Sequence, residues 1–568
     1  MKKTGHKQML EKGNINNFSD ISSQIANNCR NPHSGGFNRR PIKWAYTINS
    51  FIHNRNFTLY RIKSWSSNLM VVLTLLTVLC STGCNSNEPS ESSPSTSYLV
   101  EDIPLPDGLT AEVGGMDFLP NGNLIVCFHR GEVMTYNPAT KEWSLFAMGL
   151  HDPLGLHVVS DSEILIMQQP ELTRLKDTDG DGVADLYETV SDEFGLSGNY
   201  HEFNYGPVKD KAGNLYFALN TASSGGEIKD IVRGPVNLLG RDGEDGQRQM
   251  YSVVPYRGWM MKLHPDGELI PYASGLRSPN GLGFDGEGNL FVADNQGDWV
   301  STSTLYHIQE NHFYGHPASL VWKDDWPARN PFDEPIEKLN SMRTVAAVLF
   351  PQGIMANSPS EPLCDLTGGK FGPFEGQLFV GEMNRDRIVR VMLEKVNGKF
   401  QGACVPFIDH QGLRMGNNRL AFGPDGDLWV GQTEHGWAGA MGIQRIRFTG
   451  KTPFDIHTMN LTKDGFDLTF TQPITKDALD STTFHLRHYY YDYYKKDLSE
   501  PVDKSIQIDV QEVPVSDLLL SKDKMKVSMK IDELKPGYIY ELKLENLKSN
   551  QGIALENTLI CYTLNELK

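Results

Sequence analysis

Met116-Asp-Phe-Leu-Pro-Asn-Gly-Asn-Leu-Ile-Val126 is the first copy of a motif that recurs along this chain. The motif joins an apolar or glycine-rich segment, a turn rich in Pro, Asp, Asn and Gly, and a second segment that usually reads Asn/Asp-Leu-aromatic-Val. Because glycine tolerates the positive φ that a tight turn requires, each copy predicts a β-hairpin. A unit that recurs in this way is typical of a repeat architecture.

Six copies lie between residues 98 and 450. The other five are Leu156–Ile166, Tyr205–Phe217, Leu282–Val292, Phe371–Val380 and Leu420–Val430. Their irregular spacing of roughly 40–90 residues fits four-stranded blades with long insertions, and no stretch has sustained helical periodicity. We therefore predict an all-β fold in which residues 98–450 form a six-bladed β-propeller.

The sequence pattern changes after Gly450. Residues 454–568 alternate strand-like runs with turns, which predicts a C-terminal immunoglobulin-like β-sandwich. The tyrosine-rich segment Tyr489–Tyr494 is expected to pack against the propeller, although stacking on sugars is an alternative. Cys364 and Cys404 are expected either to form a disulfide in an oxidising compartment or to be buried free thiols.

The N-terminal part has a different composition. A basic, Asn-rich segment precedes an apolar run from Leu69 to Leu79, which is too short to span a bilayer comfortably. The run ends at Gly83-Cys84 and resembles a bacterial lipoprotein signal. We predict an extension and signal peptide over residues 1–83, a lipid on Cys84, a tether over 84–97, and anchoring at the outer membrane or periplasmic face of a Gram-negative cell. An uncleaved anchor helix is the alternative.

Charge and cysteine spacing exclude several classes of function. Without residues 1–83 the chain has 42 Lys/Arg and 68 Asp/Glu, a formal charge of −26. Such a surface repels nucleic acid. There is no Cys-x-x-Cys, so neither a zinc ribbon nor a covalent c-type haem is expected.

The sharpest local motif runs from Asp177 to Glu188 and reads Asp-Thr-Asp-Gly-Asp-Gly-Val-Ala-Asp-Leu-Tyr-Glu. This is the spacing of a calcium-binding EF-hand loop. The predicted calcium ligands are Asp177, Asp179, Asp181, the carbonyl of Val183, Asp185 and Glu188. Because the flanking segments are not helical, we expect a structural calcium loop inserted between blades.

Propellers carry functional side chains on loops around the central channel, immediately before or after each hairpin. His201 precedes the third hairpin, and Arg277 and Asn280 precede the fourth. Asp294–Trp299 follows the fourth hairpin. Arg419 opens the sixth, and the segment Glu434-His-Gly-Trp437 follows it. A histidine suits proton transfer, and Arg with Gln suits a charged or carbonyl-rich ligand.

Residues 105–445 resemble the six-bladed soluble sugar dehydrogenases that use pyrroloquinoline quinone and calcium, and the related sorbosone-dehydrogenase-like propellers. The resemblance rests on Arg277-Ser-Pro-Asn-Gly-Leu-Gly-Phe284, Asn295-Gln-Gly-Asp298 and the position of His201. It implies that His201 is the catalytic base. It also implies that Arg277, Asn280 and Arg419 contact the cofactor, and that Gln296 and Gly297 supply carbonyls to its calcium.

The sequence departs from that family at several of these places. Ser278 stands where the family has Asn, and Asp298 where it has Pro. The segment Gly416-Asn-Asn-Arg419 keeps one of two expected arginines, and the expected Lys has no counterpart near Arg385.

We expect an exported quinoprotein-like dehydrogenase that oxidises a sugar or related alcohol or aldehyde and passes electrons to a separate acceptor. One alternative is a non-catalytic glycan-binding surface lipoprotein of a polysaccharide-utilisation system. Another is a calcium-dependent lactonase or hydrolase whose channel ion is held by Asp294, Asn295 and Asn220.

Overall fold

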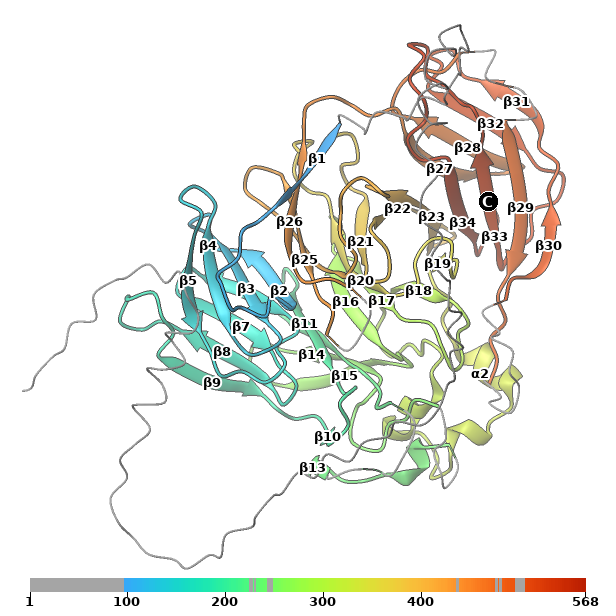
Figure 1. Ribbon diagram of the computed structural model, residues 1–568. Coiled ribbons are helices and arrows are strands. Elements are labelled where there is room, and N and C mark those ends of the chain that lie inside the picture. Colours follow the sequence, from blue (N-terminus) through green and yellow to red (C-terminus); the bar gives the residue numbers. More distant parts are fainter. Residues whose placement is uncertain are drawn as a thin grey trace, which may run out of the picture. The chain divides into compact units, whose positions relative to one another are not determined.

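The computed structural model describes residues 97–223, 228, 231–242, 249–435, 439–475, 479, 483–495 and 506–568 (Figure 1). It is 45% strand and 4% helix, which confirms the all-β prediction. Cys84, the signal segment and the tether up to residue 96 lie outside the described residues. In the part of the chain that is described, no helix has the length and apolarity needed to cross a membrane.

The first three sheets each contain four antiparallel strands. The first contains β2 (Val113–Phe118), β3 (Leu124–Phe128), β4 (Val133–Asn137) and β5 (Glu142–Ala147). The second contains β6 (Leu156–Ser160), β7 (Glu163–Met167), β8 (Leu172–Lys176) and β9 (Leu186–Ser191). The third contains β11 (Asn204–Lys209), β12 (Leu215–Leu219), β14 (Trp259–Leu263) and β15 (Leu269–Ser274).

The next three sheets repeat this order. The fourth contains β16 (Pro279–Phe284), β17 (Leu290–Asp294), β18 (Ser303–His307) and β19 (Val348–Phe350). The fifth begins with β20 (Pro359–Cys364), β21 (Leu378–Glu382), β22 (Ile388–Val396) and β23 (Lys399–Phe407). The sixth contains β24 (Asn417–Phe422), β25 (Leu428–Gln432), β26 (Gly442–Phe448) and β1 (Tyr98–Asp102).

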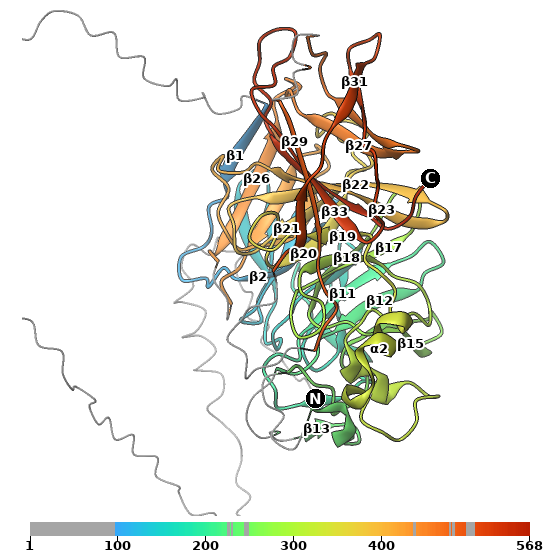
Figure 2. The same ribbon diagram turned by 90° about the vertical axis from the view of Figure 1, so that its right-hand side faces the viewer.

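The first strands of these sheets form a closed ring. β2, β6, β11, β16, β20 and β24 contact one another in that order, and β24 contacts β2 again. Glycines permit the close approach, since a Cβ on Gly155 would lie 2.1 Å from the carbonyl oxygen of Gly206. β1 completes the last sheet by pairing with β26, so that Tyr98 lies opposite Phe448 and the two ends of the ring are hydrogen-bonded (Figures 1 and 2).

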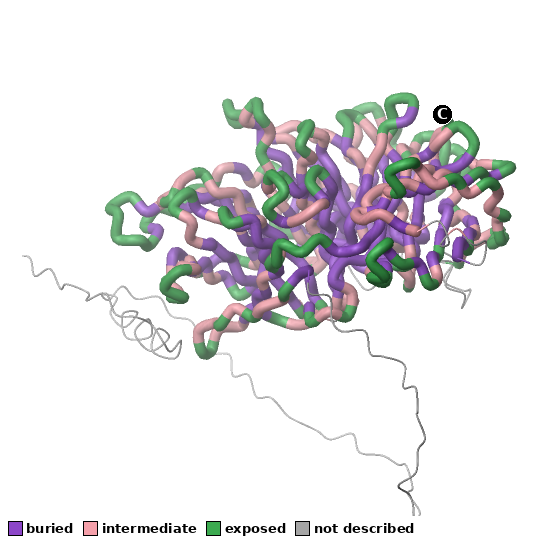
Figure 3. Tube along the Cα trace, turned by 90° about the horizontal axis from the view of Figure 1, so that it is seen from above, coloured by how far each residue is buried: buried purple, intermediate pink, exposed green. Residues whose placement is uncertain are grey.

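Long segments precede the third sheet and interrupt the third and fourth sheets. They hold the pair β10 (Leu196–Ser197) and β13 (Ile231–Arg233), the short helices η1 (Leu238–Gly240), η2 (Pro317–Trp322) and η3 (Pro331–Asp333), and α2 (Ile336–Met342). Figure 3 shows buried residues along the strands and exposed residues mainly in the loops around them.

Five of the six predicted hairpins are confirmed, and the first strand of the fifth is wrong. That strand is Pro359–Cys364, whereas the predicted segment from Phe371 onward is a connection. Phe371 and Phe374 are apolar because they are buried in the core around Tyr98 and Phe407. Apolar character therefore came from packing and not from strand alternation.

The C-terminal residues form two further sets of strands. β34 (Leu559–Leu564), β33 (Tyr538–Leu544), β29 (Phe484–Tyr490) and β30 (Ile508–Glu512) extend the fifth sheet through the pair β23–β34. β27 (Ile456–Thr462), β28 (Gly465–Phe470), β32 (Lys526–Lys530) and β31 (Ser516–Leu520) make a separate sheet. One apolar core, which includes Phe466, Tyr540 and Tyr562, joins the two.

The tyrosine-rich segment packs inside the protein, as predicted. Tyr489 is fully buried and its hydroxyl donates to Glu541. Tyr493 packs on Trp299, and its hydroxyl donates to the carbonyl of Gly315 in the fourth sheet's insertion. These contacts leave no role for the two rings in stacking on a sugar.

The cysteines in the described part of the chain are buried free thiols rather than disulfide partners. Cys364 belongs to β20, whereas Cys404 on β23 lies opposite Cys561 on β34. Of the two alternatives for Cys364 and Cys404, the structure therefore has the buried free thiols, because two intervening strands separate them in the sheet.

Candidate functional site

A cavity of about 430 Å³ opens where the first residues of the ring strands meet. His201, Arg277 and Asn280 line it together with His129 and His435. Three residues that the sequence placed before the third and fourth hairpins are thus brought to one cavity. Its size is typical of a site for a small ligand.

His201 is held in one tautomer. Its Nδ1 lies 2.9 Å from the carbonyl oxygen of Thr221, which can only accept, so Nδ1 carries the proton and Nε2 has a free lone pair. Burial, helped by the nearby charge of Arg277, lowers the pKa of His201 to about 4. The imidazole is therefore neutral at pH 7, as a proton acceptor must be.

Arg277 lies against the backbone at Gly297. A Cβ on Gly297 would approach the Arg277 Nε to 2.7 Å, and the φ of +140° at Gly297 would strain any other residue. Arg277 Nε is buried and makes no hydrogen bond with any described residue. Of the described residues that line the cavity, Arg277 alone carries a permanent positive charge.

Asp298 opposes that charge. Its carboxylate lies 4.0 Å from Arg277 Nε and accepts from His316 Nε2 at 3.3 Å and from the Met250 N–H at 2.6 Å. Burial by itself would raise the pKa of Asp298, but the hydrogen bond from His316 and the charge of Arg277 outweigh it and lower the pKa to about 2. The residue that replaces proline therefore places a fixed negative charge in the wall.

Arg419 is not free to bind a ligand in this cavity. Its guanidinium donates to the carbonyls of Gly114, Leu154, Asn280 and Asn418. Those carbonyls come from the first, second, fourth and sixth sheets. The structure thus corrects the expected cofactor contact: Arg419 uses its donors to tie the ring strands together.

Asn280 and the carbonyls of Gln296 and Gly297 differ in whether they are free to contact a cofactor or its calcium. Asn280 lines the cavity and donates its side-chain N–H to the Met383 sulfur at 3.0 Å. The Gly297 carbonyl accepts from the N–H groups of Trp299 and Val300, so both its lone pairs are used inside the turn. Gly297 is therefore disfavoured as a calcium ligand, and Gln296 stays a prediction.

Two residues at the cavity were missed by the sequence reasoning. His129 follows the second strand of the first hairpin, at the place that Asn295 has after the fourth. Asp152, which contacts His129, stands in Gly149-Leu-His-Asp-Pro where Ser278 stands in the equivalent motif before the fourth hairpin. Comparing equivalent positions in every repeat was the signal that could have found both.

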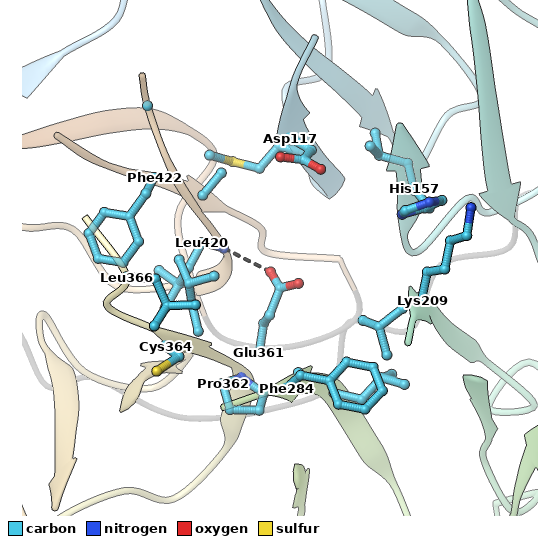
Figure 4. A pocket seen from close by; sticks show the side chains of 18 of the residues that line it. Asp117, His157, Lys209, Phe284, Glu361, Pro362, Cys364, Leu366, Leu420 and Phe422 are labelled. Carbon is cyan, nitrogen blue, oxygen red and sulfur yellow. Dashed lines mark hydrogen bonds between the residues drawn. The ribbon is translucent and has the colours of Figure 1, made fainter. Parts of the chain in front are cut away.

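A second cavity of about 540 Å³ is lined by residues of the six ring strands and of the loops beside them (Figure 4). Asp117, His157, Lys209 and Glu361 line it. Glu361 accepts from the Leu420 N–H at 2.9 Å, and burial raises the Glu361 pKa to about 7. Burial also lowers the pKa of His157 to about 4. The sequence reasoning named none of these residues.

The predicted calcium loop joins β8 to β9. The carboxylates of Asp177, Asp179 and Asp181 offer oxygens within 4.8 Å of one another, and Asp177 accepts from the N–H groups of Gly180 and Gly182. Val183 lies in the same loop.

The structure corrects the prediction for the last two ligands of that loop. Asp185 turns to Thr178, from whose N–H and hydroxyl it accepts. Glu188 belongs to β9 and pairs with Arg174 on β8. A helix would carry the twelfth residue back to the ion, whereas strand pairing carries it away.

A family model described as "Domain of unknown function (DUF7133)" matches residues 139–433, which is more than half of the chain. The chain belongs to the DUF7133 family. The matched residues contain His201, Arg277, Asn280, Arg419 and the acidic loop, whereas His129 and His435 lie outside them. No protein with a curated description matches this DUF7133 chain.

Several solved structures are similar to this DUF7133 protein. A PQQ-bound aldose sugar dehydrogenase from Streptomyces coelicolor has 17% identity and a TM-score of 0.39, covering 62% of this chain and 99% of that one. The apo-form of soluble aldose sugar dehydrogenase from Escherichia coli has 14% identity and a TM-score of 0.43, covering 62% and 99%. The PQQ domain of pyranose dehydrogenase from Coprinopsis cinerea has 14% identity and a TM-score of 0.42, covering 62% of this chain and 96% of that one. Because one fold supports many activities, function must be argued from the cavity.

The acidic loop of this DUF7133 protein gives a direct test. We expect Asp177→Ala combined with Asp181→Ala to abolish the fall in melting temperature that a chelator causes in the calcium-loaded wild type, because an ion that binds the folded state stabilises it. Glu188→Gln is the matched control and should keep the chelator response, since Glu188 pairs with Arg174. A wild-type melting temperature that ignores chelators would show that the loop holds no calcium.

Proposed function

We propose that this protein is a quinoprotein-like dehydrogenase that oxidises a hydroxyl group of a sugar or a related alcohol or aldehyde. The observation that carries the proposal is His201, whose Nδ1–H is fixed on Thr221 while the neutral ring lines the cavity. A substrate hydroxyl that reaches Nε2 can hand over its proton there.

The cavity residues fit a planar anionic cofactor. Arg277 offers a buried Nε that makes no hydrogen bond with the described residues, and Asn280, Asn295 and Asn418 add amide groups to the lining. Bound there, pyrroloquinoline quinone would supply a two-electron acceptor for the hydride of the substrate. Arg277 would hold one of its carboxylates, and Asp298 would limit how much negative charge the cavity accepts.

Calcium beside the cofactor has weaker support. Of the two predicted carbonyls, we propose only that of Gln296 as a ligand, because the Gly297 carbonyl accepts from two N–H groups. We propose calcium mainly for the loop of Asp177, Asp179 and Asp181, where its role is structural.

The two alternatives have less support from the site. A channel calcium of the lactonase type needs free inward carboxylates, whereas Asp294 accepts from the N–H groups of Arg277 and Ser278 with its two oxygens. Glycan binding through the tyrosine-rich segment cannot use the rings of Tyr489 and Tyr493, because both are buried. A proton acceptor in a fixed tautomer has no purpose in a passive binding site.

Reconstitution tests the proposal. The full chain is incubated with pyrroloquinoline quinone and calcium, its absorbance spectrum is recorded, and dye reduction is followed with a panel of sugars. We expect a bound-quinone spectrum and substrate-dependent dye reduction. Absence of both with every sugar would overturn the dehydrogenase proposal and favour glycan binding.

We also propose the finer organisation that the sequence suggested. The six sheets over residues 98–450 are read as six propeller blades closed by β1, and residues 454–568 as an immunoglobulin-like sandwich.

A lipid on Cys84 would hold the protein at the outer membrane or periplasmic face, with electrons leaving to a separate acceptor. Cys84→Ser should release the protein from membranes, and unchanged fractionation and mass would rule out the lipid.

A further inference from the structure

His129, Asp152 and His435 meet at the wall of the 430 Å³ cavity. The Asp152 Oδ1 lies 3.6 Å from His129 Nδ1 and 3.4 Å from His435 Nε2. One donor atom from each residue lies within 4.8 Å of the other two. The two imidazoles stack with their ring centroids 4.2 Å apart.

These separations fit a shared ion better than direct contacts. Both are longer than a good hydrogen bond to a carboxylate. Two ligands about 2.0–2.1 Å from a tetrahedral ion lie roughly 3.3 Å from each other. The two separations from the Asp152 oxygen are therefore close to the spacing between neighbouring corners of such a tetrahedron.

His129 supplies an independent sign that something is bound. Its side chain is 5% exposed, and neither ring nitrogen makes a hydrogen bond with any described residue. Burying an imidazole with both nitrogens unsatisfied is unfavourable. A cation on Nδ1 would satisfy the nitrogen that faces Asp152.

Glu112 orients the second histidine. Its buried carboxylate lies 3.3 Å from His435 Nδ1, so Nδ1 carries the proton that it donates. His435 Nε2, on the other side of the ring, lies toward Asp152 and must release any proton to bind an ion. A carboxylate behind a ligating histidine is the usual outer partner at metal sites.

The donor set selects the kind of ion. Calcium and magnesium prefer oxygen ligands, whereas imidazole suits zinc and other divalent transition metals. Two nitrogens with one carboxylate oxygen are typical of a three-ligand zinc site with a fourth position left open. Both imidazoles line the cavity, so a molecule in the cavity can reach the ion.

We propose that His129, Asp152 and His435 bind one divalent transition-metal ion of the zinc type, with Glu112 as a positioning residue. The ion sits in the wall of the cavity that contains His201. Phe203 lies between the two places, with its ring centroid 5.7 Å from that of His201 and 6.4 Å from that of His435. The site does not depend on a quinone.

Zinc binding to the full chain tests the site. The protein is freed of metal with a chelator and dialysed, and excess calcium is added to saturate the acidic loop. It is then titrated with Zn²⁺ against a chromogenic chelator. We expect one tightly bound zinc in the wild type and a weakening of more than about 100-fold in His435→Gln and Asp152→Asn. With Co²⁺, the wild type should give the strong visible bands of a tetrahedral complex.

Two further variants complete the experiment. His485→Gln removes an exposed histidine of β29 and should leave zinc affinity unchanged. Glu112→Gln should weaken binding about 10–100-fold while the metal-free melting temperature stays the same. The proposal is overturned if wild type takes up no zinc beside calcium, or if His435→Gln and Asp152→Asn bind it as wild type does. Neither outcome bears on dye reduction, which tests the dehydrogenase separately.

Discussion

Replacing His201 with alanine is expected to lower kcat for sugar oxidation by about 10²–10⁴, with little change in quinone binding. The imidazole removes a proton only as the reaction proceeds, so its loss affects the transition state more than the bound state. Stopped-flow or steady-state dye reduction after reconstitution measures kcat, and the absorbance spectrum measures quinone binding.

The pH dependence adds a second readout for His201. Because burial lowers its pKa to about 4, the imidazole is neutral above that pH and protonated below it. Activity should therefore fall on the acid side near pH 4, well below the ordinary histidine value of about 6.5. An acid limb near 6.5 would mean that another histidine is the base.

Arg277→Ala is the matched comparison for His201→Ala. It removes the one permanent positive charge of the described lining, so we expect weak quinone retention and no bound spectrum. The two variants must therefore differ: one binds the quinone without turnover, and the other fails to bind it. If His201→Ala turns over like wild type, the dehydrogenase survives and the assignment of its base does not.

Arg419→Met is expected to lower the free energy of unfolding by about 3–5 kcal/mol. Four buried carbonyls lose a charged donor, at roughly 1 kcal/mol or more for each unsatisfied group. The first, second, fourth and sixth sheets would lose a common tie at the centre of the ring. Urea unfolding followed by tryptophan fluorescence measures the change.

Arg447→Met controls for loss of an arginine as such. Arg447 is half exposed and pairs with Glu101 at the surface, so its removal should lower stability by less than about 1 kcal/mol. If Arg419→Met unfolds like wild type but no longer binds the quinone, then Arg419 is the cofactor contact that the family resemblance implied. The ring would then be held together by its strands alone.

The repeats made the β architecture readable from the sequence. Turn glycines such as Gly288 and the alternating segments beside them are local signals, and a hairpin needs nothing more. The alternation of apolar residues gave a wrong strand at Phe371. Phe371 is buried against Tyr98 of β1, which is 273 residues away in the sequence. An apolar residue in a loop and one in a strand look alike until the partner is known.

The sequence likewise predicted some residues of the candidate site correctly and others wrongly. His201, Arg277 and Asn280 were found because they stand beside hairpins, where a propeller gathers its loops. The sequence also assigned Arg419 to the cavity and Glu188 to calcium, because residue type and spacing do not tell which way a side chain points. Strand pairing turned Glu188 to Arg174, and the ring carbonyls took the donors of Arg419.

Local sequence patterns were therefore enough to predict the hairpins, the all-β class and the surroundings of His201, because these depend on contacts within a few tens of residues. Which hydrogen-bond donors and acceptors are free depends on the folded chain. The tertiary structure brought His129 and Asp152 to His435, more than 280 residues later, and it occupied the Gly297 carbonyl within its own turn. Hydrogen-bond satisfaction and metal geometry are properties of atoms in space, so closure of the ring had to come first.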